Sequence, residues 1–236
     1  MHIAIAGTRG IPARYGGFET FAEELARRLV ARGHRVTVYC RQRHTEPTYA
    51  GVQLVALPTI RHKYLDTVVH TGISTLHLLF HRTDAALYCN AANAIFTWMP
   101  RAAGVPVALN VDGLERNRKK WNALGQAWYR VSEWLSTFCP NEVITDAREI
   151  EQYYASRHRK TSTMIPYGAP CEKETGTHEV QRLGLRPGEY FLYVSRMEPE
   201  NNALLVREVF ERVATRLQLA LIGDAPYAAE YIARVR

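Results

Sequence analysis

The chain has 236 residues, enough for one large domain or two smaller ones with a sizeable buried core. Hydrophobic residues make up 47% and charged residues 22%, a balance that excludes an intrinsically disordered chain. The net charge of +7 favours acidic partners, such as nucleotide phosphates, anionic lipids or nucleic acid.

The cysteines and the N-terminus indicate a reducing compartment. No C-x-x-C pair occurs, which argues against a zinc site and a dense disulfide framework. We therefore expect buried free thiols at Cys40, Cys89, Cys139 and Cys171. No signal peptide is visible, and no stretch reaches the roughly 20 apolar residues of a membrane-spanning helix. These features predict a cytoplasmic protein whose membrane contact is peripheral.

From the N-terminus to about residue 165, short β-rich runs alternate with helical patterns. The predicted strands are 2–6, 35–40, 52–56, 85–88, 105–110, 142–145 and 162–165. The predicted helices are 18–32, 64–81, 91–103, 122–138 and 147–156. This alternation predicts an α/β domain with a doubly wound parallel sheet, whose ligands bind beyond the carboxyl ends of the strands.

A Pro- and Gly-rich stretch, residues 166–188, separates this pattern from a second one. The second pattern has strands 190–194 and 218–222, a helix 202–216, and a last helix from Pro226. Two strands do not make a stable parallel sheet with its own core. Either the second part leans on the first domain or it is truncated, and we expect domains 1–168 and 169–236 with the second truncated.

The loop after the first strand is the first candidate site. Gly16 and Gly17 precede a helix, where backbone N–H groups can hold phosphate and glycine lets a ligand approach closely. Glu19 either joins this site or only complements the helix dipole. Gly7 and Gly10 do not form a G-x-G-x-x-G motif, which disfavours a nicotinamide dehydrogenase.

The segment from Asn110 to Glu115 follows another strand end. Asp112 or Glu115 could bind sugar hydroxyls or take a proton. The alternative is an Asx-type turn at Asp112-Gly113.

A cationic segment follows, with Arg116, Arg118 and Lys119 ahead of several aromatic residues that end at Trp134. Basic residues beside aromatic ones suit a membrane interface that carries anionic lipid. The same composition could contact nucleic acid, but the sequence contains no recognisable nucleic-acid-binding motif such as a helix-turn-helix. The remaining alternative is a solvated helix face with core tryptophans. The apolar run Leu65–Phe80 could form a second interfacial helix, although we expect it to belong to the core.

His77 and His81 could share a helix face and bind a metal ion. No acidic or cysteine partner lies at a suitable spacing, so we expect no metal site.

The second α/β pattern carries two candidate turns. Arg196 follows strand 190–194 and can pair with phosphate in a bidentate way. Gly223 and Asp224 end the next strand at the same sheet edge, and Asn201 opens a helix there. We expect these residues to bind a phosphorylated donor, although Pro199 and Glu200 could simply shape a helix start.

The motif G-T-R-G-I-P-A-x-Y-G-G-F-E-T spans residues 7–20, and further matches lie at 110–115, 165–169, 195–202 and 223–225. In these segments the chain resembles retaining glycosyltransferases of the GT-B fold, similar to family 4. The opening motif is most similar to a bacterial group that includes rhamnosyltransferases of polysaccharide assembly.

This resemblance implies two Rossmann-like domains facing each other across a cleft, the first binding the acceptor and the second the nucleotide sugar. Gly16 and Gly17 would lie near the donor diphosphate, and Asp112 would face the reacting sugars. Arg196 would neutralise the charge on the departing nucleotide. From the residues themselves, we expect Glu19, Glu115, Arg118 and Lys119 to bind the acceptor. No metal or other cofactor is implied.

The chain departs from the family in two ways. The broader family has a Lys shortly after the arginine, where this chain reads Glu200-Asn201-Asn202. The family's E-x7-E segment would lie beyond Arg236, so we expect the 236-residue form to be inactive.

For the full-length enzyme, we expect transfer of a hexosyl group, such as rhamnose, with retention to a lipid-linked or saccharide acceptor at the inner face of the plasma membrane. The alternative is a non-catalytic sugar- or lipid-binding module that retains only the acceptor domain.

Overall fold

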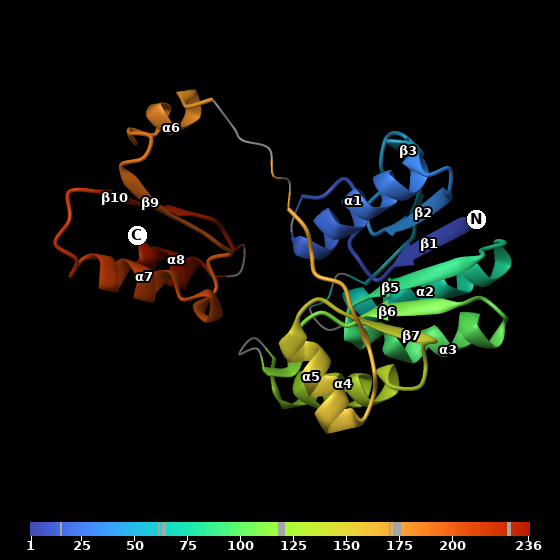
Figure 1. Cartoon of the computed structure of the whole chain (residues 1–236). Coiled ribbons are helices and arrows are strands. Elements are labelled where there is room, and N and C mark those ends of the chain that lie inside the picture. Colours follow the sequence, from blue (N-terminus) through green and yellow to red (C-terminus); the bar gives the residue numbers. More distant parts are fainter. Residues whose placement is uncertain are drawn as a thin grey trace. The chain divides into compact units, whose positions relative to one another are not determined.

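The structure is a computed structural model that describes residues 1–14, 16–60, 62, 65–117, 121–169, 171, 176–225 and 228–236. Its residues form two compact units, Met1–Gly168 and Ala169–Arg236 (Figure 1). Each unit is described by itself below.

Unit 1 is built on an eight-stranded sheet with the order β3-β4-β2-β1-β5-β6-β7-β8. The strands are β1 (His2–Ala6), β2 (Arg35–Cys40), β3 (Thr48–Tyr49), β4 (Val52–Ala56), β5 (Ala85–Cys89), β6 (Val107–Asn110), β7 (Glu142–Thr145) and β8 (Thr163–Met164). Neighbouring strands are parallel except at the edge, where β3 pairs with β4 in the antiparallel direction. The predicted parallel α/β sheet is confirmed. The short strand β3 was not predicted.

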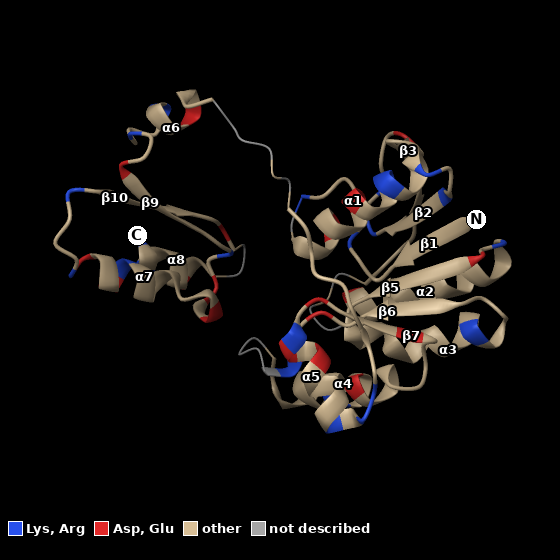
Figure 2. Ribbon diagram, viewed as in Figure 1, with Lys and Arg blue, Asp and Glu red and all other residues tan. Residues whose placement is uncertain are grey.

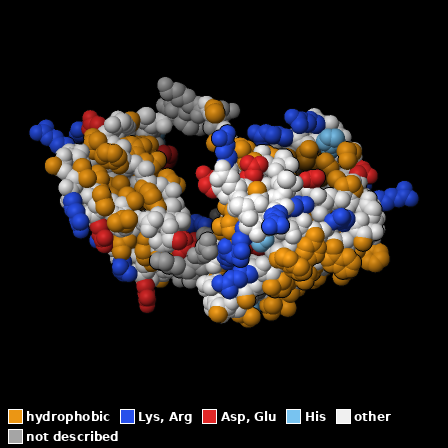
Figure 3. All heavy atoms as spheres, turned by 60° about the horizontal axis from the view of Figure 1, so that its bottom comes forward, with side chains coloured by type: hydrophobic (Ala, Val, Ile, Leu, Met, Phe, Trp, Pro, Cys, Tyr) orange, Lys and Arg blue, Asp and Glu red, His pale blue; other side chains and the backbone are white. Residues whose placement is uncertain are grey.

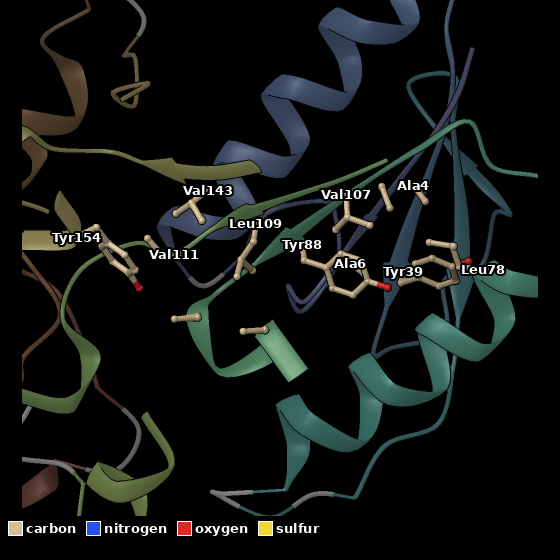
Figure 4. Packing of buried hydrophobic residues seen from close by; sticks show 13 residues of the cluster. Ala4, Ala6, Tyr39, Leu78, Tyr88, Val107, Leu109, Val111, Val143 and Tyr154 are labelled. Atoms are coloured by element: carbon tan, nitrogen blue, oxygen red, sulfur yellow. The ribbon is translucent and has the colours of Figure 1, made fainter. Parts of the chain in front are cut away.

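Helices cover both faces of this sheet (Figure 1). Helix α1 (Gly17–Ala31) packs on one face, where Ala22 and Ala26 join the buried strand residues. The other face holds α2 (Asp66–Phe80), α3 (Ala94–Ala102), α4 (Ala123–Ser136) and α5 (Arg148–His158), with the 3-10 turns η1 (Ala91–Asn93) and η2 (Glu115–Asn117). Figure 4 shows this second core, in which Tyr39 of β2 lies beside Leu78 of α2. The two clusters together give the doubly wound arrangement expected from alternating strands and helices.

Helix α2 corrects one expectation. We expected the run Leu65–Phe80 to belong to the core, but Leu76 and Phe80 are 50% and 86% exposed. The fully buried positions of α2 include the polar residues His70 and Thr75. The polar side chains point inward because the neighbouring sheet supplies a hydrogen-bond partner: the Thr75 hydroxyl lies 2.8 Å from that of Tyr88.

Unit 2 has a two-stranded parallel sheet made of β9 (Tyr190–Val194) and β10 (Gln218–Ile222). It also contains α6 (His178–Arg182), the 3-10 turn η3 (Pro199–Asn201), α7 (Ala203–Phe210) and α8 (Ala229–Val235). A small cluster of Met197, Ala203, Ala225 and Val235 is buried between these elements.

The helix predicted over 202–216 was too long, because α7 ends at Phe210. The N–H groups of Arg212 and Val213 bond carbonyls three residues back, which tightens the last turn. The Thr215 hydroxyl then accepts the N–H of Leu217, a local bond that competes with helix continuation.

The prediction of buried free thiols holds for Cys40, Cys89 and Cys139 and is wrong for Cys171, which is exposed. Among the described residues, no helix is both long and apolar enough to cross a membrane.

Candidate functional site

The strand order of unit 1 places the candidate site between β1 and β5. Strands β2 and β4 lie on one side of β1 and β5 on the other, so the winding direction reverses there. Ligands of doubly wound sheets bind outside the carboxyl ends of the strands at such a reversal. The loops after β1 and β5 approach closely at this edge: a Cβ on Gly7 would lie 2.3 Å from the carbonyl oxygen of Cys89. Gly7 also has a φ of +89°, so glycine is required for two reasons.

Two carboxylates of α1 hold the loop after β1 in place. Glu19 accepts the N–H of Arg9 at 3.0 Å. Glu23 accepts the N–H of Ala13 at 2.6 Å and the Tyr49 hydroxyl at 2.8 Å. Glu19 is only 7% exposed, so its clearest structural role is to brace the loop. A contact between Glu19 and an acceptor stays a prediction.

The N-terminus of α1 offers backbone N–H groups without a side-chain cap. Gly16 is the N-cap residue, with an extended backbone and no capping side chain. Gly17 begins the helix, and a Cβ there would meet no atom within 4 Å. This open space and the uncapped N–H groups are what an anionic ligand requires at a helix start. Phosphate binding by Gly16 and Gly17 stays a prediction.

Asn110, at the end of β6, organises the second candidate loop. Its side chain is buried, accepting the N–H of Asp112 at 3.2 Å and donating to the Tyr167 hydroxyl at 3.2 Å. Asp112 adopts a left-handed backbone with a φ of +57°. An Asp tolerates this conformation better than most residues, but it is still strained. The Asx-type turn is therefore formed by Asn110 and not by Asp112, and it holds the half-buried Asp112 side chain at the carboxyl edge.

The loop residues also act on one another through their charges. Burial raises the pKa of the Cys89 thiol, and the carboxylates of Glu19 and Asp112 raise it further. Burial likewise raises the pKa of Tyr167, with Asp112 as the next cause. The Tyr167 ring packs against Phe21 of α1, with ring centroids 5.1 Å apart. The loops after β1, β5 and β6 and the segment after β8 thus meet in one region.

The cationic segment is only partly visible. Arg118 and Lys119 lie outside the described residues. Glu115 is 8% exposed and receives the indole N–H of Trp121 at 3.4 Å. Arg116 lies 3.4 Å from the buried carboxylate of Glu133.

The guanidinium of Arg116 also lies over the Tyr153 ring, 5.3 Å from its centre. This side chain is therefore tied to α4 and α5. We had expected Arg116 to belong to a cationic membrane-facing segment, and its internal contacts correct that expectation.

An ion pair at the same edge was missed by the sequence reading. Arg41 follows β2 directly, and its guanidinium donates to Asp66 at 2.5 Å and to Thr67 at 3.0 Å. Its backbone N–H donates to the carbonyl of Arg9. Burial lowers the pKa of Arg41, and the Asp66 carboxylate opposes that shift. The sequence could have indicated Arg41 by its place as the first residue after a predicted strand, where parallel sheets display ligand-binding side chains.

In unit 2, the turns after β9 and β10 meet, as predicted. Gly223 has a φ of +153°, and a Cβ there would lie 1.7 Å from the carbonyl oxygen of Ser195. The N–H of Ser195 donates to Ile222, and that of Met197 donates to Asp224. Glycine at 223 is therefore a packing requirement of the paired turns. This gives a structural role to one predicted donor-binding residue.

Arg196 lies on the first of these turns. Its guanidinium is 3.7 Å from the Glu198 carboxylate, and its side chain is 38% exposed. The Asn201 side chain donates to the Arg196 carbonyl at 2.7 Å, which fixes the turn. The Asp224 carboxylate accepts the N–H of Ala225 at 2.8 Å. Asn201 and Asp224 therefore shape the turns, and phosphate binding by these residues and Arg196 stays a prediction.

Within the described residues, no group of three or more His, Cys, Asp or Glu side chains is placed to hold a metal ion. His77 and His81 stack with ring centroids 3.8 Å apart. Their ring nitrogens bond within the protein, His77 with the Tyr39 hydroxyl and His81 with the His77 carbonyl.

Solved structures share the fold of the whole described chain. Sucrose-phosphate synthase from Thermosynechococcus elongatus is 15% identical with a TM-score of 0.77, covering 99% of this chain and 65% of that one. HepE from Anabaena, in complex with UDP and glucose, is 14% identical with a TM-score of 0.71, covering 100% and 64%. WaaG, a glycosyltransferase involved in lipopolysaccharide biosynthesis, is 15% identical with a TM-score of 0.64, covering 99% and 66%.

The chain thus spans just under two thirds of the length of these structures. At such identities the similarity shows the fold alone, which is the GT-B type that the resemblance implied. A comparison with curated proteins found no match. The sequence profile described as Glycosyltransferase Family 4 matches residues 15–173, which include α1 and the loop of Asp112. Because this match covers more than half of the residues of the chain, the chain belongs to Glycosyltransferase Family 4.

Proposed function

We propose that the protein is a glycosyltransferase that moves a hexosyl group, such as rhamnose, from a nucleotide diphosphate sugar to a lipid-linked or saccharide acceptor. The match to Glycosyltransferase Family 4 carries this proposal. The HepE structure, which contains UDP and glucose, supports a nucleotide sugar as the donor. We place the reaction in cell-surface polysaccharide synthesis at the inner face of the plasma membrane, with retention of the anomeric configuration and without a metal ion.

Unit 1 would bind the acceptor, and unit 2 the donor. In the transfer, the bond between the anomeric carbon and the diphosphate breaks, a new bond forms between that carbon and the oxygen of an acceptor hydroxyl, and the hydroxyl proton passes to the departing diphosphate. Negative charge then accumulates on the departing nucleotide. Arg196 would neutralise this charge, which stabilises the transition state. To do so, its guanidinium would exchange Glu198 for a phosphate, a partner with more charge and bidentate geometry.

Asp112 would act on the sugars. The bond from its N–H to Asn110 and its left-handed backbone fix the position of its carboxylate at the sheet edge. A carboxylate held in this way can accept hydrogen bonds from sugar hydroxyls. The helix start at Gly16 and Gly17 would face the donor diphosphate.

Calorimetric titration with dTDP, UDP and GDP tests the donor half of this proposal. We expect one of the three to bind, and Arg196→Ala to weaken that binding about 10- to 100-fold, the loss of a charge-assisted hydrogen bond. Arg186→Ala is the matched control, because Arg186 also pairs with a nearby glutamate in unit 2, Glu189 at 3.5 Å. If Arg196→Ala and Arg186→Ala bind the nucleotide equally well, Arg196 has no part in the donor site.

A further inference from the structure

Helix α2 buries mostly polar side chains and exposes large apolar ones. Its fully buried positions are the polar residues His70, Thr71, Ser74 and Thr75 and the apolar Leu78. The hydroxyls of Ser74 and Thr75 donate to carbonyls four residues back in the same helix. Its outward positions include Leu76 and Phe80, which are 50% and 86% exposed. A helix on a water-facing surface shows the opposite distribution. The exterior of α2 is therefore suited to an apolar environment.

The two neighbouring helices extend this apolar exterior. Helix α3 packs between α2 and α4, so the three helices lie side by side. Trp98 of α3 and Trp134 of α4 are 53% and 59% exposed, and Phe138, just after α4, is 46% exposed. An apolar groove of about 490 Å³ lies between α3 and α4. Figure 3 shows hydrophobic side chains gathered in a broad area of unit 1 where these helices lie. We call this surface the α2–α4 face.

The charges around the α2–α4 face are predominantly basic, although the acidic residue Asp84, two positions after Arg82, is also exposed. The three helices carry two acidic residues, and both are engaged inside the unit: Asp66 pairs with Arg41 and the buried Glu133 with Arg116. Arg101 and Arg130 are exposed, as is Arg82, two residues after α2, and the Arg101 guanidinium donates to the carbonyls of Phe138 and Pro140. Figure 2 shows how few charged residues lie along α2 and α3. The surface is therefore apolar and aromatic with a cationic border.

We propose that the α2–α4 face lies in the head-group region of an anionic lipid bilayer. Exposed Trp and Phe side chains beside arginines are typical of interfacial membrane surfaces. Arg82 and Arg130 would pair with lipid phosphates. A second copy of the chain fits less well, because a two-fold contact would bring the two cationic borders together. This inference depends on the proposed function in one respect, namely that the acceptor lies at the membrane.

Vesicle flotation tests the proposal. We expect the protein to float with phosphatidylcholine vesicles that contain phosphatidylglycerol, and less with phosphatidylcholine alone. Phe80→Ser combined with Trp98→Ser should weaken this binding at least about tenfold, because two large apolar side chains no longer enter the bilayer. The matched control is Leu183→Ser, an apolar residue of unit 2 that is 62% exposed. Circular dichroism melting of each variant verifies that it folds.

Spectroscopy identifies the residues in the bilayer. Brominated lipid should quench the fluorescence of the wild type, and Trp98→Phe combined with Trp134→Phe should lose most of that quenching while still floating. Quenching that persists unchanged in this variant overturns the proposed face.

The proposal is also overturned if the wild type stays at the bottom of the gradient with anionic vesicles. The same holds if the Phe80 and Trp98 variant floats like the wild type. A dimer in sedimentation analysis that this variant dissociates, without vesicle binding, would assign the face to a second copy. Nucleotide titration separates this proposal from the previous one. Nucleotide binding without flotation overturns only the membrane face, whereas flotation without nucleotide binding overturns only the donor site.

Discussion

Gly7→Ala tests the close approach of the loops after β1 and β5, on which the location of the candidate site depends. An alanine Cβ would lie 2.3 Å from the Cys89 carbonyl oxygen and 2.7 Å from the Asn93 amide nitrogen. Both neighbours belong to buried residues, and the nearer atom is backbone, so neither can move away easily. The φ of +89° adds conformational strain.

The size of the effect follows from these two terms. A left-handed backbone at a non-glycine residue costs roughly 1–2 kcal/mol. Inserting a methyl group into a packed core costs about 1–3 kcal/mol more. We therefore expect Gly7→Ala to lower the free energy of unfolding by about 2–5 kcal/mol, or the Tm by roughly 5–20 °C for a unit of this size.

Urea unfolding followed by tryptophan fluorescence is the appropriate assay, because all four tryptophans lie in unit 1. Two glycines serve as controls that separate the cost of backbone strain from the cost of the steric clash. Gly33 has a φ of +83°, and a Cβ there would meet no atom within 4 Å, so Gly33→Ala measures backbone strain alone. Gly17 has neither strain nor a near neighbour, so Gly17→Ala should be neutral or stabilising by up to about 1 kcal/mol. If Gly7→Ala costs no more than Gly33→Ala, the two loops do not approach as described.

Two further predictions concern buried groups. Burial lowers the pKa of His70 to about 4, so this residue stays neutral in the folded state while the unfolded chain gains a proton below pH 6.5. The free energy of unfolding should therefore fall as the pH drops from 6.5 to 4. His70→Gln keeps a donor for the Cys40 carbonyl and should reduce this loss by about 2–3 kcal/mol at pH 4.5, as measured by urea unfolding. An equal pH dependence of the variant and the wild type would contradict this prediction. A thiol reagent should modify Cys171 alone in the native protein and all four cysteines in denaturant. The reason is that burial raises the pKa of the Cys40 thiol to about 11 and also raises the pKa values of Cys89 and Cys139. Rapid reaction of a second thiol in the native protein would contradict this prediction.

Much of the fold could be predicted from local patterns. Strands such as β1, β2 and β4 were predicted with their observed bounds, because each is a short apolar run between turn residues. The strand β3 has two residues, too few for a periodic pattern, and α6 has five. Helix α7 ends where the N–H groups of Arg212 and Val213 bond carbonyls three residues back, a change that the spacing of apolar residues does not indicate.

The candidate site was only partly predictable. The strand ends that carry Asp112 and Arg196 were found, because parallel strands display residues at their carboxyl ends. The bracing contacts of Glu19 and Asn201 were not, since each joins residues that face each other only after the loops fold. The pairing of Arg41 with Asp66 joins β2 to α2 across 25 positions, a separation at which the sequence carries no signal.

The sequence by itself determined the alternation of strands and helices, the glycines of the loops and the division near residue 168. These features depend on local backbone preferences and on the periodicity of apolar residues. Only the tertiary structure decided which face of α2 is buried. Periodicity assigns polar residues to the outside, but Thr75 has its partner in Tyr88 on a neighbouring strand, so its hydroxyl is satisfied in the core and Phe80 is left outside.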